Sequence, residues 1–288
     1  MRLGNKVGGV DRMAVMAETS AAPLREAGSI SRWAAALRQV RSPHFSPYKL
    51  YIRRDLRLAV MLNPMVGSTM FRTLVVEGMR EAGMAPALGP LWPIRRTRRY
   101  MTAPPRDFLH LLLRPECYRL HCFVRNPYAR LLSAWKDKFT LTSSGDPAAR
   151  SMKRELQTVR RFAARCGLPG AEAGSAVPLG TFVAYVESQA EGRRNQHWDT
   201  QVSVLGCGTR TYDHIWRMET DFAAGMTSIL TQVGLSRSWL EDRLSRPRNA
   251  SRRLAEPVYN ARLAARVWRI YRADFQQFGY AADSWESL

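Results

Sequence analysis

Two segments of the chain follow the same order: a short apolar run, a tight turn, and a helix with one apolar face. In the first segment, the run 58–62 leads into the turn 63–69 and a helical stripe that ends near Ala82. In the second, the run 118–124 leads into Arg125-Asn126-Pro127 and a stripe that ends at Phe139. Such runs suit strands buried on both faces. The two units predict a parallel α/β sheet with its ligand at the carboxyl ends of the strands.

The rest of the chain is assigned from hydrophobic periodicity and turn residues. Residues 1–48, rich in Ala, Gly, Ser and Arg, are expected to be an N-terminal extension with one helix at 30–40, and residues 49–288 one α/β domain. Further helices are expected at 152–166, from about 181, at 222–233 and at 257–278, with a strand at 212–218. Asn126 is the expected N-cap of the helix in the second unit, with Pro127 at its first position.

Composition removes several classes of protein. The chain has 288 residues, of which 45% are hydrophobic, and its apolar runs fall well short of the roughly 20 residues that cross a bilayer. With no apolar leader after Met1, we expect a cytoplasmic protein without a membrane span. Its four cysteines are widely spaced, which predicts reduced core thiols. A metal site is not expected, because alternation along a strand points His121 and Cys122 to opposite faces.

The charge is strongly positive and is carried almost entirely by arginine. Lysine and arginine number 44 against 24 acidic residues, a net charge of +20, and 39 of the 44 are arginine. Guanidinium groups bind phosphate, sulfate and carboxylate through two parallel hydrogen bonds, although a bias of the source genome would give the same count. A nucleic-acid-binding protein is a third-ranked alternative, favoured only by the charge and by the Arg-Arg-Thr-Arg-Arg run at 95–99.

Both turns carry residues suited to binding an anion. Gly67-Ser68-Thr69 offers backbone N–H groups, two hydroxyls and a helix N-terminus, although an ordinary helix cap would look the same. The turn has no lysine, which disfavours an ATPase or a kinase. Arg125 leaves a buried strand, and Arg130 and Ser133 fall opposite the apolar stripe of the next helix. The last two are therefore expected to be solvated or to face a ligand.

The second turn resembles a known family. Its sequence Phe-Val-Arg125-Asn-Pro-Tyr-Ala-Arg-Leu-Leu-Ser133-Ala-Trp-Lys-Asp-Lys-Phe139 is similar to the 3′-phosphate-binding segment of carbohydrate sulfotransferases, the Golgi-type sulfotransferase family 2 and its bacterial relatives. In the same order, residues 64–69, 195–201, 212–220, 249–251 and 270–280 are similar to further motifs of that family. The resemblance covers about residues 58–280. It implies a P-loop-like three-layer α/β domain, in which a central, mainly parallel sheet is flanked by helices.

The resemblance also implies a donor and its binding residues. These enzymes use 3′-phosphoadenosine 5′-phosphosulfate and need no metal. Arg125 and Ser133 would bind the 3′-phosphate, and the loop residues would hold the 5′-phosphosulfate: Pro64, Met65, Gly67, Ser68 and Thr69. The loop lysine of the family is Met65 here, and losing such a cation in a closed site commonly costs several kcal/mol of barrier. We hypothesise that Arg53, Arg54, Arg57 or Arg72 replaces it.

Transfer to a hydroxyl also needs a base, and a neutral histidine is suited to that role. His197, in the polar cluster 195–201, is the first candidate, although it could merely hold the loop. His121 faces a buried strand, and His110 and His214 are weaker candidates. Glu219 could orient the base or serve as a helix N-terminal acid. Trp198 could stack on a ring of the ligand or belong to the core.

The leading interpretation is a sulfotransferase that moves a sulfuryl group to a hydroxyl of a saccharide or glycan; an anionic acceptor would suit the positive charge. The second, favoured by Met65, is a catalytically impaired protein that binds the nucleotide or a sulfated glycan. Neither interpretation predicts the oligomeric state.

Overall fold

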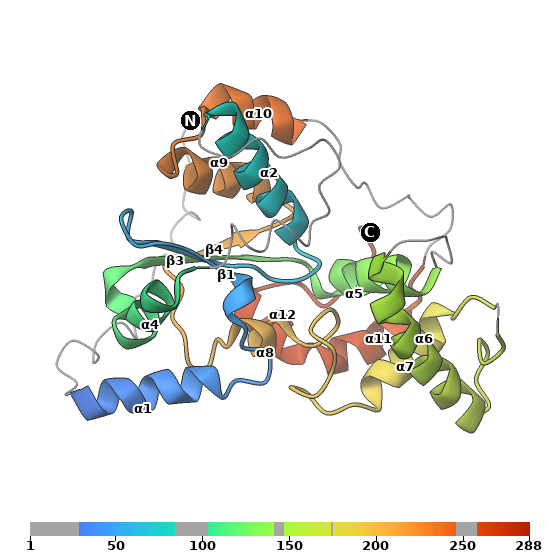
Figure 1. Ribbon diagram of the computed structural model, residues 1–288. Helices are drawn as coiled ribbons and strands as arrows, with labels where there is room; N and C mark the ends of the chain where they lie inside the picture. The colour runs from blue at the N-terminus through green and yellow to red at the C-terminus, as the bar shows by residue number, and fades with distance from the viewer. Residues whose placement is uncertain (1–28, 84–102, 141–146, 174, 246–257) are drawn as a thin grey trace, which may run out of the picture.

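The computed structural model describes residues 29–83, 103–140, 147–173, 175–245 and 258–288, and its centre is one sheet (Figure 1). Within these residues the sheet has four strands in the order β1-β2-β3-β4: β1 (Leu50–Arg53), β2 (Leu58–Met61), β3 (Arg119–Val124) and β4 (His214–Arg217). Strands β2, β3 and β4 run parallel, with Met61 opposite Cys122 and Cys122 opposite Ile215. The mainly parallel α/β sheet predicted from the sequence is confirmed.

Strand β1 is an addition that the sequence pattern did not predict. It pairs antiparallel with β2, with Leu50 opposite Met61 and Arg53 opposite Leu58. A tight hairpin turn joins the two strands, and Arg57 takes a left-handed conformation in it (φ 50°). The turn therefore lies at the opposite end of the sheet from the loop that follows β2.

Helices cover both faces of the sheet, which makes the predicted three layers. Above it in Figure 1 lie α2 (Ser68–Glu81), α9 (Phe222–Gln232) and α10 (Arg237–Ser245). Below it lie α8 (Gln201–Leu205) and α12 (Arg272–Phe278), with α4 (Pro105–Leu113) and α1 (Ser29–Val40) in contact beside them. Strand alternation fills both layers, since Val60 and Phe123 belong to the upper core and Met61 and Cys122 to the lower one.

A third group of helices lies beside the sheet and has its own core. It comprises α5 (Pro127–Trp135), α6 (Pro147–Arg165), α7 (Leu179–Glu187) and α11 (Ala261–Ile270). Trp198, which is fully buried, lies at the centre of this core against Phe139 and Phe182. Trp198 is therefore a core residue, the second of the two interpretations that the sequence allowed.

Most predicted helices are present, and two differ in extent. The helix expected to reach Phe139 ends at Trp135 and continues as one π turn, Lys136–Thr140. The single helix expected at 257–278 is two helices, α11 and α12, that break at Tyr271 (φ −110°, ψ 21°). The buried Tyr271 hydroxyl donates a hydrogen bond to the Trp198 carbonyl, a tertiary contact that helical periodicity does not contain.

The expected N-cap at α5 is confirmed: the Asn126 side chain accepts a hydrogen bond from the Tyr128 N–H (3.0 Å). The cysteines are all unpaired, but only Cys122 is fully buried and Cys166 is exposed, so the prediction of four core thiols is wrong for Cys166. None of the helices in the described ranges has both the length and the apolar character that crossing a bilayer requires. The cytoplasmic location and the boundary at residue 48 stay predictions.

Candidate functional site

The loop after β2 leads directly into the N-terminus of α2. Met65 and Gly67 both have left-handed backbones (φ 66° and 69°), and Gly67 is the N-cap of α2. A Cβ added at Gly67 would lie 2.3 Å from the Phe222 ring, so only glycine fits there. No side chain caps this helix within the described residues. Its first N–H groups are therefore available to an anion, as the Gly67-Ser68-Thr69 pattern predicts.

The loop after β3 brings a cation against the first loop. Arg125 follows β3, and its Nη1 donates a hydrogen bond to the Met65 carbonyl (3.3 Å). Burial lowers the pKa of Arg125, and the neighbouring Glu219 opposes that shift. A guanidinium that has lost much of its hydration beside uncapped N–H groups is a strong attractant for a phosphate or sulfate.

Gln201 links the two loops through the hydrogen bonds of its side chain. Its side chain is completely buried, and its Oε1 accepts hydrogen bonds from Asn63 Nδ2 (2.9 Å) and from the Arg125 N–H (3.0 Å). Its Nε2 donates to the Arg125 carbonyl (2.8 Å). One amide side chain thereby fixes the chain just before the first loop to the chain at the start of the second.

Arg130 connects the first loop to the 195–201 segment. Its Nε donates to the Pro64 carbonyl (3.2 Å), its Nη1 to the Asp199 carbonyl (2.6 Å) and its Nη2 to the Gln196 carbonyl (2.9 Å). Only 1% of the residue is exposed. The prediction that Arg130 is solvated or faces a ligand is therefore wrong. The helical pattern could not predict this role, because the hydrogen-bond partners of Arg130 lie 66 and 69 residues away in the sequence.

His197 lies in the segment that Arg130 holds. Its Nδ1 is 2.7 Å from Asn195 Oδ1, and Asn195 Nδ2 donates to Glu155 Oε1 (2.9 Å). Because Glu155 accepts from the amide nitrogen, the amide oxygen faces His197, so Nδ1 carries the ring proton. Nε2 is then the basic nitrogen of the neutral ring. Burial lowers the pKa of His197 to about 4, and the neighbouring cations Lys138 and Arg130 add to that effect.

Two buried carboxylates support the 195–201 segment from behind. Asp199 accepts hydrogen bonds from the Gly192 N–H (2.8 Å) and the Thr200 N–H (2.9 Å), and pairs with His44. Asp274 accepts from the N–H groups of Gln201 (2.8 Å) and Val202 (2.9 Å) at the start of α8. These contacts fix the position of the backbone that carries both His197 and Gln201.

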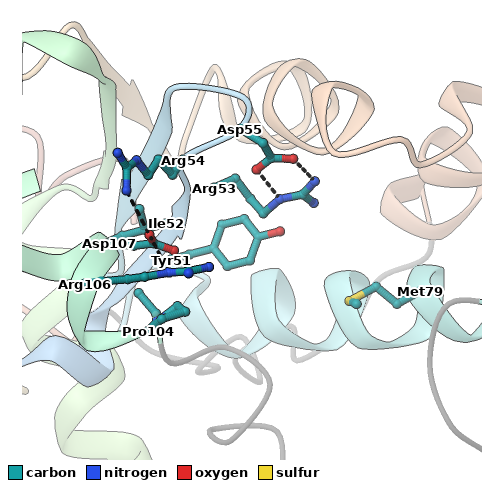
Figure 2. Close-up of a pocket in the computed structure, with 10 residues that line it drawn as sticks. Tyr51, Ile52, Arg53, Arg54, Asp55, Met79, Pro104, Arg106 and Asp107 are labelled. Carbon is teal, nitrogen blue, oxygen red and sulfur yellow. Dashed lines mark hydrogen bonds and ion pairs between the residues drawn. The ribbon is translucent and has the colours of Figure 1, made fainter. Parts of the chain in front are cut away.

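Three of the four arginines considered as replacements for the loop lysine lie elsewhere. Arg53, Arg54 and Arg57 are at or beside the β1–β2 turn, at the far end of the sheet. A hollow of about 760 Å³ lies there, and Figure 2 shows residues that line it, among them Tyr51, Met79 and several charged side chains. Arg53 pairs with Asp55 (2.6 Å) and Arg54 with Asp107 (4.0 Å), so carboxylates already engage these cations. Arg72 follows the loop on α2 and already interacts with another residue.

The structure connects some of the predicted site residues through contacts and places the others on helices α2 and α5. Pro64, Met65, Gly67 and Arg125 are joined by direct contacts or by one loop, and Arg130 ties this loop to the segment of His197. Ser68 and Thr69 begin α2, whereas Ser133 lies on α5, eight residues after Arg125. The sequence analysis did not single out Gln201, Asn195 or Glu155 for the parts they play here.

Two of the remaining candidates, Glu219 and His121, form contacts that stabilise the fold. Glu219 accepts hydrogen bonds from the Asn126 N–H (2.8 Å) and the Tyr280 hydroxyl (2.9 Å), so it anchors the second loop. His121 is buried on β3 and accepts a hydrogen bond from Trp216 Nε1 (3.2 Å). Among the described residues no group of three histidine, cysteine or acidic side chains could hold a metal ion. The arginine run at 95–99 lies outside these residues.

A three-layer α/β fold with an uncapped helix N-terminus after β2 and a partly buried arginine after β3 has the features of proteins that bind phosphate-bearing ligands at one sheet edge. Residues 97–281 match the family model described as "Sulfotransferase family". Because this match covers more than half of the chain, the chain belongs to the sulfotransferase family. The match begins after the Gly67 loop, and in the structure Arg125 and Arg130 join that loop to the matched region.

Curated relatives are carbohydrate sulfotransferases at modest identity. The chain is 24% identical to carbohydrate sulfotransferase 11 of Rattus norvegicus over 181 residues, 61% of this chain and 50% of the relative. It is 30% identical to carbohydrate sulfotransferase 14 of Danio rerio over 134 residues, 46% and 33% of the two chains. The chain thus spans half or less of the length of these relatives. No solved structure matches it significantly.

Proposed function

We propose that this protein transfers a sulfuryl group from 3′-phosphoadenosine 5′-phosphosulfate to a hydroxyl of a saccharide or glycan. The observation that carries the proposal is the contact between Arg125 and the loop that opens α2. It sets a desolvated guanidinium beside uncapped helix N–H groups, and this combination suits a ligand with several anionic groups. The names of the relatives support a saccharide as the acceptor.

In this proposal each anionic group of the donor has its own partners. The N–H groups and hydroxyls of Gly67, Ser68 and Thr69 hold the 5′-phosphate end. Arg125 and Ser133 hold the 3′-phosphate. Gln201 and Arg130 bind no ligand; they fix the loops in place before the nucleotide arrives, which lowers the cost of ordering them on binding.

His197 is the proposed base. Its Nδ1 proton is committed to Asn195, which leaves Nε2 to accept the proton of the acceptor hydroxyl. The depressed pKa of about 4 keeps the ring neutral near pH 7, so Nε2 has a lone pair that can accept a proton. Within the described chain, Nε2 has no hydrogen-bond partner that would compete with a substrate.

A protein that binds the nucleotide without turning it over is the second candidate, because Met65 stands where a loop cation would stabilise the leaving group. Two measurements decide between these functions. Calorimetry with 3′-phosphoadenosine 5′-phosphate is expected to show binding that falls at least tenfold in Arg125→Ala, and no binding to the wild type would reject both candidates. Transfer of labelled sulfate to a panel of saccharides then separates an enzyme from a binding protein.

A further inference from the structure

The loop at the 5′ end of the proposed donor site has no cation of its own. Its side chains from Asn63 to Thr69 are uncharged. Three of the candidate arginines are far away, at the β1–β2 turn. A helix N-terminus contributes only about half a unit of positive charge, so a phosphosulfate bound there still needs a counter-charge.

Arg125 and Arg130 both contact this loop: Arg130, which bonds to the Pro64 carbonyl, is fully buried, whereas Arg125 is partly exposed and can reach a ligand. Its Nη1–Met65 carbonyl bond joins the guanidinium to the very residue where the charge is missing. Glu219, the acidic residue near Arg125, already accepts hydrogen bonds from the Asn126 N–H and the Tyr280 hydroxyl. In the described chain Arg125 forms no ion pair, and a guanidinium has five N–H donors, so several of them are open to an anion.

We propose that Arg125 replaces the missing loop lysine by binding the 5′-phosphosulfate end of the donor as well as the 3′-phosphate. The inference rests on the proposed function, since it concerns the same nucleotide. A guanidinium is suited to this double role because its planar fork can bond two oxyanions at once, which an ammonium does less well.

The charge matters at the moment of transfer. The bond between the sulfur and the oxygen that bridges it to the 5′-phosphate breaks, and a bond forms between the sulfur and the acceptor oxygen. The acceptor proton passes to His197 Nε2, and the bridging oxygen leaves with the electron pair as part of the 5′-phosphate. Negative charge grows on that oxygen, so a cation held at Met65 lowers the barrier.

A nucleotide lacking the 3′-phosphate tests the inference directly. Calorimetry is done with 3′-phosphoadenosine 5′-phosphate and with adenosine 5′-phosphate on the wild type, Arg125→Ala and Ser133→Ala. We expect Arg125→Ala to weaken both nucleotides at least tenfold, and Ser133→Ala, the matched control, to weaken only the first. Unchanged affinity of Arg125→Ala for adenosine 5′-phosphate would overturn the inference and leave the proposed function standing. A wild type that binds neither nucleotide would overturn both.

A double-mutant cycle with Met65→Lys provides an independent test. Lysine has nearly the shape of methionine, so the substitution restores the missing charge with little repacking. If Arg125 already provides that charge, Met65→Lys raises affinity for adenosine 5′-phosphate less than threefold in the wild type and at least tenfold in Arg125→Ala. Equal gains in both backgrounds contradict the inference. If Arg125→Ala does not fold, a gain of tenfold or more in the wild type alone contradicts it.

Discussion

At the residue scale, the guanidinium of Arg130 holds together parts of the chain that are far apart in sequence. It donates to carbonyls in the first loop and in the 195–201 segment, and it is fully buried. Among the described residues no carboxylate bonds to it directly; the carboxylates of Asp199 and Asp274 are close enough to stabilise its charge. Its contribution is therefore to satisfy three backbone acceptors, of which the Asp199 carbonyl is fully buried and the other two are partly buried.

Arg130→Ala is expected to lower the free energy of unfolding by about 2–4 kcal/mol, because it leaves these carbonyls unpaired and opens a cavity. Urea denaturation gives the value. Arg193→Ala is the matched control, since Arg193 is exposed in the same segment, and we expect a change within about 0.5 kcal/mol. Equal effects of the two substitutions would show that Arg130 is not a structural clamp.

Burial is the main cause of the low pKa of His197, and the nearby cation Lys138 adds to it by disfavouring the imidazolium. Lys138→Met should therefore raise the pKa of His197 part of the way from its value of about 4. An NMR titration of the imidazole measures this without requiring turnover. Arg38→Met, which removes an exposed charge from α1, should leave the titration where it was. A pKa of His197 that does not move in Lys138→Met contradicts the assignment.

At the scale of elements, the first loop depends on α9, which begins 155 residues after Gly67. The Phe222 ring at the start of α9 covers Gly67, while Met65 in the same turn adopts a left-handed backbone. A non-glycine residue in that conformation costs about 1–2 kcal/mol, which the surrounding contacts must offset. The shape of the loop is thus set by packing between α2 and α9.

Gly67→Ala tests this packing, and Gly83→Ala is its control. Both glycines have nearly the same φ (69° and 68°), but nothing lies within 4 Å of a Cβ at Gly83. We expect Gly83→Ala to cost about 1 kcal/mol from backbone strain alone. Gly67→Ala should cost a further 1–3 kcal/mol, roughly, because the Phe222 ring must move. Equal unfolding midpoints for the two variants in urea would mean that the ring yields freely.

At the scale of the whole molecule, the stability should depend on pH through groups in different layers. Burial lowers the pKa of His121 and of His197 to about 4 each, whereas it raises that of Asp274 to about 6. Below pH 6.5 the unfolded chain binds protons at the two histidines before the folded chain does, so stability falls as the pH falls toward 4. Asp274 acts in the opposite direction between pH 6 and 4, because the folded state keeps its proton longer.

Together, the two histidines and Asp274 make the unfolded state bind about one proton more than the folded state in this pH range. We expect the free energy of unfolding to fall by roughly 1.4 kcal/mol per pH unit between pH 6 and 4.5. His121→Asn removes one histidine and should flatten this dependence, since the remaining histidine and Asp274 nearly cancel. Urea titrations at pH 7, 6, 5 and 4.5 on both proteins give the slopes. A wild type whose stability does not change with pH in this range would contradict the assigned pKa shifts.

Local pattern was enough to predict the elements at the centre of the fold. The apolar runs at β2 and β3, the cap at Asn126 and the stripe of α5 are all encoded within a few residues. Strand β1 escaped prediction because its antiparallel pairing with β2, and not a local period, makes Leu50–Arg53 a strand. The break at Tyr271 escaped because its cause is a hydrogen bond to Trp198, 73 residues earlier.

The sequence by itself therefore determined the two strand-turn-helix units and the family pattern, since both depend on residues that are neighbours along the chain. Only the tertiary structure decided what the charged residues do. It shows that Arg130 bonds to the protein backbone and that Arg125 contacts Met65. It also shows that Asn195, held by Glu155, orients the His197 ring. The physical reason is that a buried polar group must find its hydrogen-bond partner wherever the fold brings one, and here these partners are up to 69 residues away.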